Sequence, residues 1–410
     1  MNRRSAMCRL LATGAVVLAG GSLGPQPKLR AADKPDAAPT FVRKAEKGFI
    51  DDPMAIDSKG KWLAAIRTDS ASFADLAHID LETGKTTSSF SLGSGQQIFE
   101  RVVFTGVGRS IVLVSRDPAT GKRSAVRFDE TGKVTGSVGP ADQIGFPQRN
   151  EKQYAVLYSR SVDKKKRPTT VLAVHDLQDL KAVGKPRTFV EEQGLVSLSG
   201  QTQPIKVLGF QDEYAQLVAQ QPGGYDKASD VRVPDKAGIY DLLRSQWIWN
   251  GEIKDVLAWA YANKFRSTQP SKACFLDIPE TQDSLYLIDG LGGRAGVDMR
   301  EEFEMYDLRS LASQEVSAAG TLFFSMAVDP MNPGALQRKK ADQPKLDLYR
   351  IDIPGPGDLF SGGRRPATHL LRAKLDNRPV GWVAGPGVAV ILRKFKAYSR
   401  GGDAIEIYRL

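Results

Sequence analysis

The chain has 410 residues with a formal net charge of +10, and hydrophobic residues make up 41% of it. This is the composition of a soluble globular protein, and it excludes a disordered chain. The chain has only 3 histidines and 2 cysteines, which argues against a disulfide-rich scaffold, a cysteine-based zinc site and an iron–sulfur site.

Residues 1–32 have the features of an export signal. Arginines near the start precede the uncharged, apolar stretch Leu10–Ala19, and small residues follow it. This stretch is about ten residues long, whereas a helix that spans a bilayer needs about twenty. No other window is long and apolar enough, so no transmembrane span is predicted. We expect a periplasmic or secreted protein, with the cleavage point left open between Gly21 and Ala32.

The segment after the signal is predicted to be a linker followed by one folded domain. Residues 33–40 are rich in proline, alanine and lysine, and the domain is expected at 41–410. Cys8 would leave with the signal, so Cys274 would be the one cysteine of the mature chain. The apolar neighbours of Cys274 favour a buried, unreactive thiol.

A short pattern recurs along the domain, in which alternating residues lead to an aspartate and then a turn. The repeat aspartates are Asp80, Asp129, Asp176, Asp241, Asp307 and Asp352. Their spacing is about 45 to 66 residues, which fits the blade period of a β-propeller with insertions in the middle blades. Glycine in Thr83-Gly-Lys85 and Thr131-Gly-Lys133 suits a tight reversal because glycine tolerates positive φ.

An apolar run precedes most of these turns and predicts a β-strand. The runs are Trp62–Ile66, Ser110–Val114, Tyr154–Tyr158, Tyr214–Val218 and Val388–Leu392. Continuous apolarity predicts strands that neighbouring blades cover on both faces.

The ends of the domain predict that the first strand completes the last blade. The final repeat, Ile405–Tyr408, would be a third strand without a fourth, and the strand-like run Phe41–Ala45 is free to supply it. Such closure removes a vulnerable sheet edge. The expected fold is an all-β, single propeller of seven blades; six or eight blades stay open because residues 250–291 are irregular.

The first repeat, Lys59–Lys85, resembles the repeats of bacterial WD-repeat-like, TolB-type propellers. In those repeats a strand such as Gly-Lys-Trp-Leu-Ala-Ala is followed by Ile-Asp-Leu-x-Thr-Gly-Lys. The second repeat is a fair match, and later ones keep only the strand, the aspartate and the leucine. The resemblance covers about residues 41–410 and implies a fold, not a function.

Motifs for catalysis, cofactors or metals are weak, so no catalytic residue, no cofactor and no metal is predicted. Gly290–Gly296 follows a strand but leads into a propeller repeat instead of the helix of a nucleotide site. The histidines have no zinc-ligand spacing. His78 and His175 occupy matching positions beside repeat aspartates, which predicts a histidine–aspartate hydrogen bond that serves packing.

Clusters of basic residues offer a first candidate binding surface. They are Lys164, Lys165, Lys166 and Arg167, and Arg338, Lys339 and Lys340. Either these are solvated loops, or they gather on one rim and attract an anionic protein, glycan or lipid headgroup. No nucleic-acid partner is predicted, because no aromatic-interleaved recognition motif appears.

Aromatic residues offer a second candidate binding surface. Trp247, Trp249, Trp259 and Tyr261 alternate in the region of the longest repeat spacings. Packing between blades is one interpretation, and a carbohydrate or peptide site is the other.

The function expected from these features is an exported, non-catalytic, monomeric propeller scaffold for protein–protein or ligand binding in the periplasm or cell envelope. The alternative is a propeller lyase or hydrolase that acts on an extracellular polymer with carboxylates, tyrosine and arginine around the channel. Two carboxylates, or a Tyr–Arg–His set, at the channel mouth would favour the enzyme.

Overall fold

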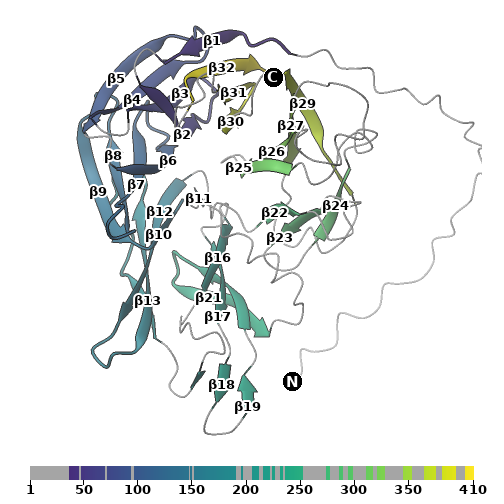
Figure 1. The fold of residues 1–410 in the computed structure, drawn as a ribbon. Helices are drawn as coiled ribbons and strands as arrows, with labels where there is room; N and C mark the ends of the chain where they lie inside the picture. Colours follow the sequence, from purple (N-terminus) through teal and green to yellow (C-terminus); the bar gives the residue numbers. More distant parts are fainter. Residues whose placement is uncertain are drawn as a thin grey trace, which may run out of the picture. The chain divides into compact units, whose positions relative to one another are not determined.

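The structure is a computed structural model (Figure 1). It describes residues 37–190 apart from 46–47, 70–71, 94–96, 147 and 150–151, then strands and short connections between 195 and 393, and residues 402–410. All regular elements of this described part are β-strands. None of the described residues belongs to a helix with the length and hydropathy needed to traverse a bilayer.

The described strands form seven sheets of four or five strands and one sheet of three. The first sheet joins four strands in chain order: β2 (Phe49–Ile56), β3 (Trp62–Thr68), β4 (Ala74–Asp80) and β5 (Thr86–Gly93). The second repeats this order with β6 (Ile98–Phe104), β7 (Ile111–Arg116), β8 (Arg123–Phe128) and β9 (Val134–Ala141). The third has β10 (Gln143–Gly145), β11 (Gln148–Arg149), β12 (Lys152–Val162), β13 (Pro168–Asp176) and β14 (Arg187–Val190).

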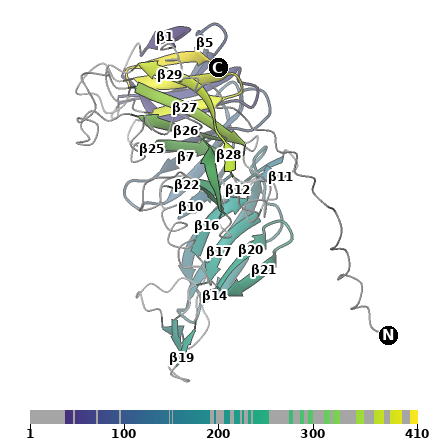
Figure 2. The ribbon, with the colours of Figure 1, turned by 90° about the vertical axis from the view of Figure 1, so that its right-hand side faces the viewer.

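The middle of the chain departs from this regular order. The fourth sheet contains β16 (Lys206–Gln211), β17 (Gln216–Gln221), β20 (Lys236–Asp241) and β21 (Gln246–Glu252), which lie side by side in Figure 2. The three-stranded sheet contains β15 (Leu195–Val196), β18 (Gly224–Asp226) and β19 (Val231–Val233). The insertion between β17 and β20 thus supplies two strands of a small separate sheet.

The last three sheets contain the remaining strands. One pairs β22 (Cys274–Asp277), β23 (Tyr286–Asp289) and β24 (Arg294–Asp298) with β28 (Arg364–Pro366), which lies parallel to β24. The next has β25 (Leu311–Val316), β26 (Thr321–Ala327), β27 (Lys345–Asp352) and β29 (Thr368–Lys374). The last has β30 (Gly381–Gly385), β31 (Val388–Arg393), β32 (Ala404–Arg409) and β1 (Phe41–Lys44). The fold is therefore an all-β propeller, as predicted; the number of blades and full closure stay predictions.

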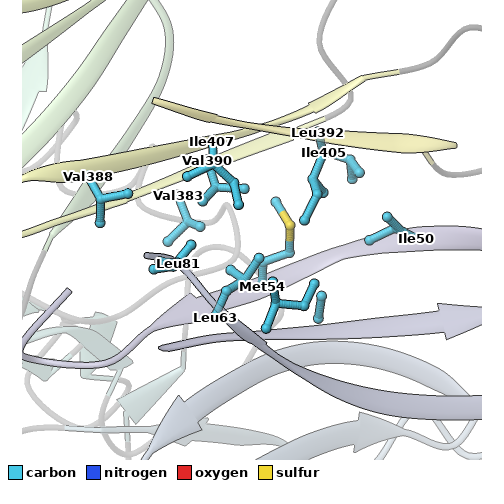
Figure 3. Close-up of a cluster of buried hydrophobic side chains, with 12 residues drawn as sticks. Ile50, Met54, Leu63, Leu81, Val383, Val388, Val390, Leu392, Ile405 and Ile407 are labelled. Carbon is cyan, nitrogen blue, oxygen red and sulfur yellow. The ribbon is translucent and has the colours of Figure 1, made fainter. Parts of the chain in front are cut away.

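In the first, second, third and last sheets the second strand is buried on both faces, which explains its continuous apolar sequence. On β3, Leu63 and Ala65 pack against the last sheet, in the cluster shown in Figure 3, whereas Ala64 and Ile66 pack against the second sheet. Strands β7, β12 and β31 divide their side chains between two clusters in the same way. Each fully buried side chain of this kind contributes about 1.5–3 kcal/mol.

The N-terminal strand joins the last sheet. Phe41 pairs with Ile407 and Lys44 with Ala404 in antiparallel register. The backbone N–H of Thr40 donates to the Ile407 carbonyl at 2.7 Å. The structure thus places β1 as the fourth strand of the last sheet, where the sequence predicts it.

The repeat aspartates shape the turns after the third strands. The Asp80 carboxylate accepts hydrogen bonds from the backbone N–H groups of Glu82 at 2.8 Å and Thr83 at 2.9 Å. Asp241 makes the same contacts with Leu243 and Arg244. The aspartate recurs because its short side chain bonds the backbone two or three residues on.

Candidate functional site

The predicted binding residues fall in different parts of the structure. Lys164–Arg167 form the turn between β12 and β13. Trp247 and Trp249 lie in β21, opposite Tyr240 and Ile239 of β20. The other predicted binding residues, Trp259, Tyr261, Arg338, Lys339 and Lys340, lie outside the described residues. The aromatic site therefore stays a prediction. The lysine turn is the predicted binding surface whose side chains the structure describes.

An aspartate organises the lysine turn. The Asp163 carboxylate accepts from the backbone N–H groups of Lys165 and Arg167, and it pairs with the Arg167 guanidinium at 2.7 Å. Lys166 takes a positive φ of 61°, and its N–H donates to the Asp163 carbonyl. Arg167 and Asp163 thus neutralise each other, while Lys164, Lys165 and Lys166 are exposed.

Hydrogen bonds to Asp163 and Asp142 keep both carboxylates ionised. The backbone N–H of Arg167 is the largest cause of the lowered pKa of Asp163. Burial raises the pKa of Asp142, but hydrogen bonds from Lys122 and Arg160, and the charges of the two side chains, outweigh burial and lower it. Both groups are therefore negative at neutral pH.

A shared aspartate connects this turn to the second sheet. Asp142 pairs with Lys122 Nζ at 2.8 Å and with the Arg160 guanidinium at 3.5 Å. Its second oxygen accepts from the Arg160 backbone N–H at 2.6 Å. Lys122 precedes β8 and Arg160 lies near the end of β12, so this carboxylate holds cations from two neighbouring sheets at one edge.

A second shared carboxylate lies at the same edge. Glu100 pairs at 2.6 Å with Arg116 at the end of β7 and at 2.6 Å with Arg123 at the start of β8. The pairing of Arg116 with Arg123 across the two strands brings like charges together. Glu100 screens their repulsion, since opposite charges within about 4–6 Å stabilise one another.

We call this surface the basic edge. Among the described residues it has twice as many basic as acidic side chains, namely Arg116, Lys122, Arg123, Arg160, Lys164, Lys165, Lys166 and Arg167 against Glu100, Asp117, Asp142 and Asp163. Within the described part of the chain, none of the three consecutive lysines has a carboxylate in ion-pair range. The excess positive charge is therefore concentrated at the turn.

The opposite edge of the same two sheets has paired charges. Lys152 lies 2.6 Å from Asp176, and Lys181 lies 3.0 Å from Asp179. Arg109 approaches Glu130 at 3.9 Å. The two edges thus differ in charge, although both are built from turns with similar aspartate caps.

The histidines do not form the predicted bonds with neighbouring repeat aspartates. His78 Nδ1 lies 3.1 Å from Ser88 Oγ, and His175 Nδ1 lies 3.0 Å from the Leu180 carbonyl oxygen. That prediction was wrong for two reasons. The Asp80 carboxylate accepts from the backbone N–H groups of its own turn instead. Asp176 follows His175 directly, so the two side chains point to opposite faces of the strand.

A histidine–aspartate pair forms instead at the third histidine. His369 Nε2 lies 3.0 Å from Asp347 Oδ1, which also accepts from Arg372 Nε at 2.8 Å. Tyr349 packs against His369 with ring centroids 4.9 Å apart. The side chains of His369, Asp347 and Arg372 are only 6%, 2% and 8% exposed. These residues lie on the third and fourth strands of their sheet, so this Tyr–Arg–His set packs the sheet.

Sequence reasoning missed most of the basic edge. The missed residues lie near strand ends and do not form a cluster of consecutive basic residues. They are Arg116, Arg123, Arg160 and the two shared carboxylates. One signal was present: Asp117-Pro-Ala-Thr-Gly-Lys122 repeats the aspartate-to-lysine turn pattern at the opposite end of the sheet. Asp117 caps that turn through the Ala119 N–H at 2.9 Å.

Comparisons with known proteins give likenesses of fold. No family model matches the chain, and no curated protein does. Among solved structures, the β-propeller domain of the trilobed protease from Pyrococcus furiosus, described as having an open velcro topology, is 10% identical with a TM-score of 0.43; the match covers 90% of this chain and 96% of that one. The Dos1 propeller is 8% identical with a TM-score of 0.42, and the match covers 91% of this chain and 94% of that one.

Proposed function

We propose that this protein is an exported, non-catalytic scaffold of the WD-repeat-like, TolB type, and that it binds an anionic partner of the periplasm or cell envelope through the basic edge. The observation that carries the proposal is the group of exposed lysines Lys164–Lys166, at the same edge as two carboxylates that are each shared between two cations.

Charge geometry supports binding over simple solvation. Glu100 and Asp142 each pair with two cations, and among the described residues no ion pair joins either carboxylate to the lysines of the turn. Exposed ion pairs contribute only about 0–1 kcal/mol each to stability, so folding alone gives little reason for such a cluster. A surface with one dominant sign of charge attracts oppositely charged partners and speeds their association.

The test compares two triple variants that change the net charge equally. The edge variant carries Lys164→Gln, Lys165→Gln and Lys166→Gln. The control variant carries Lys85→Gln, Lys133→Gln and Lys181→Gln, which replace exposed lysines in turns at the opposite sheet edges. Each mature protein is immobilised and incubated with the native envelope fraction, and the material retained is identified at low and high salt.

The proposal predicts that the wild type and the control variant retain the same partner, and that the edge variant or high salt releases it. Equal retention by all three proteins would contradict the proposal. All six lysines are exposed and the replacements remove no buried contact, so both variants should fold like wild type. Their thermal unfolding checks this.

A further inference from the structure

The basic edge has apolar side chains beside its lysines. Val162, the residue before the lysine turn, is 66% exposed, the largest value among the exposed large hydrophobic residues described. Val190 at the end of β14 is 38% exposed, and it pairs with Thr169 next to the same turn. Single exposed valines are common, but here two lie beside the same three lysines.

The turn extends beyond its own sheet. Strand β10 pairs with β12 only as far as Tyr158, and β14 pairs with β13 only from Thr169, whereas β12 and β13 continue together to Val162 and Pro168 (Figure 1). In the described part of the chain, the last pair of the hairpin, Val162 and Pro168, therefore has no paired strand on either side. Asp163 holds it in a defined turn through two backbone hydrogen bonds.

We infer that the tip of the β12–β13 hairpin docks on an anionic lipid surface, with Lys164–Lys166 among the headgroup phosphates and Val162 in the interfacial region. This inference rests on the proposed function and specifies the partner of the same site. Lysine is a compact point charge that suits a mobile layer of phosphates, whereas fixed carboxylates of a protein favour the fork of arginine. Here the exposed charges of the turn are lysines, and its arginine already pairs with Asp163.

The electrostatic and hydrophobic contributions of this small surface favour weak, reversible binding. Each lysine near an anionic surface adds attraction that falls off within a Debye length, so binding should weaken steeply with salt. An apolar side chain beside the lysines adds a hydrophobic contribution to the binding free energy, which salt does not screen. The docking is therefore peripheral.

The experiment measures sedimentation of the mature protein with phosphatidylcholine vesicles that contain either no phosphatidylglycerol or about one quarter of it. Wild type should bind only the anionic vesicles. The edge variant should lose about a hundredfold in partition coefficient, from three lysines at about fivefold each. Val162→Ser should lose about tenfold. The control variant and Val134→Ser, at an exposed valine of the opposite edge, should bind like wild type.

The outcomes separate this inference from the proposed function. Absence of binding to the anionic vesicles, or binding that the edge variant does not weaken, overturns the lipid inference. If the edge lysines are then still needed to retain an acidic protein from the envelope, the proposed function stands with a protein as the partner. If retention is also independent of these lysines, both proposals fail.

Discussion

At the residue scale, His78 is a buried side chain whose lowered pKa predicts that the stability of the fold depends on pH. It is fully buried on β4, and its ring lies 5.9 Å from Phe90 and 6.2 Å from Phe104 between centroids. Desolvation is the main cause that lowers the pKa of His78 to about 4, and the positive charge of Arg109 lowers it further. The neutral form of the imidazole is therefore favoured first by burial and second by the positive charge of Arg109.

The free energy of unfolding should fall as the pH falls from 6.5 toward 4. The unfolded state binds the proton of His78 near pH 6.5, but the folded state does so only near pH 4. The loss should reach about 3 kcal/mol at most, and it should be absent in His78→Asn. Urea unfolding at several pH values measures the difference in the free energy of unfolding between wild type and His78→Asn. Taking this difference cancels the contribution of carboxylates that titrate in both proteins. Parallel curves for the two proteins would show that His78 is not responsible.

Asp80 is a second residue with a separable role, because its carboxylate bonds two backbone N–H groups of a turn. Replacement by alanine should lower the free energy of unfolding by about 1–2 kcal/mol. Asp80→Asn keeps an acceptor oxygen and should lose less. The midpoints of urea unfolding test this order, and a result in which asparagine is as harmful as alanine would mean that charge, not hydrogen bonding, matters.

At the scale of elements, strand positions were predictable and edge contacts were not. Burial on both faces leaves a continuous apolar run, so β3, β7, β12 and β31 could be located in the sequence. The pairing of β1 followed from counting the strands of the last repeat. The basic edge could not be predicted, because Asp142 and Glu100 acquire their partners only when sheets and strands come together. The spacing of residues along the chain does not show which distant side chains meet in the folded protein.

Strand β1 should be required for the stability of the last sheet. Deleting Phe41–Ala45 removes its pairing with β32, the packing of Phe41 on the core cluster and the hydrogen bond from Arg43 to the Gly84 carbonyl. We expect a clear drop in the temperature of thermal unfolding. Val42→Ser, at a residue 52% exposed, is the control and should have little effect. If the deletion variant melted with wild type, β1 would not support the fold.

At the scale of the whole molecule, the first and last sheets of the described part of the chain meet in one core. Ile50, Leu63 and Ile79 of the first sheet pack with Val390 and Ile407 of the last sheet (Figure 3). Gly60, in the turn before β3, has a positive φ of 69°, and a Cβ atom there would lie 2.2 Å from the Pro386 carbonyl oxygen of the last sheet. This core supports the turns at both edges of the sheets. The basic edge differs from the opposite edge in its excess of positive charge.

The central claim, that a partner binds at the basic edge, is tested most directly by photo-crosslinking in the native envelope. A photoreactive residue replaces either Lys165 on the basic edge or Lys133 on the opposite edge; both positions are exposed. The structure predicts a discrete adduct from position 165, lost at high salt, and none from position 133. An adduct that forms only from position 133, or equally from both, would contradict the claim.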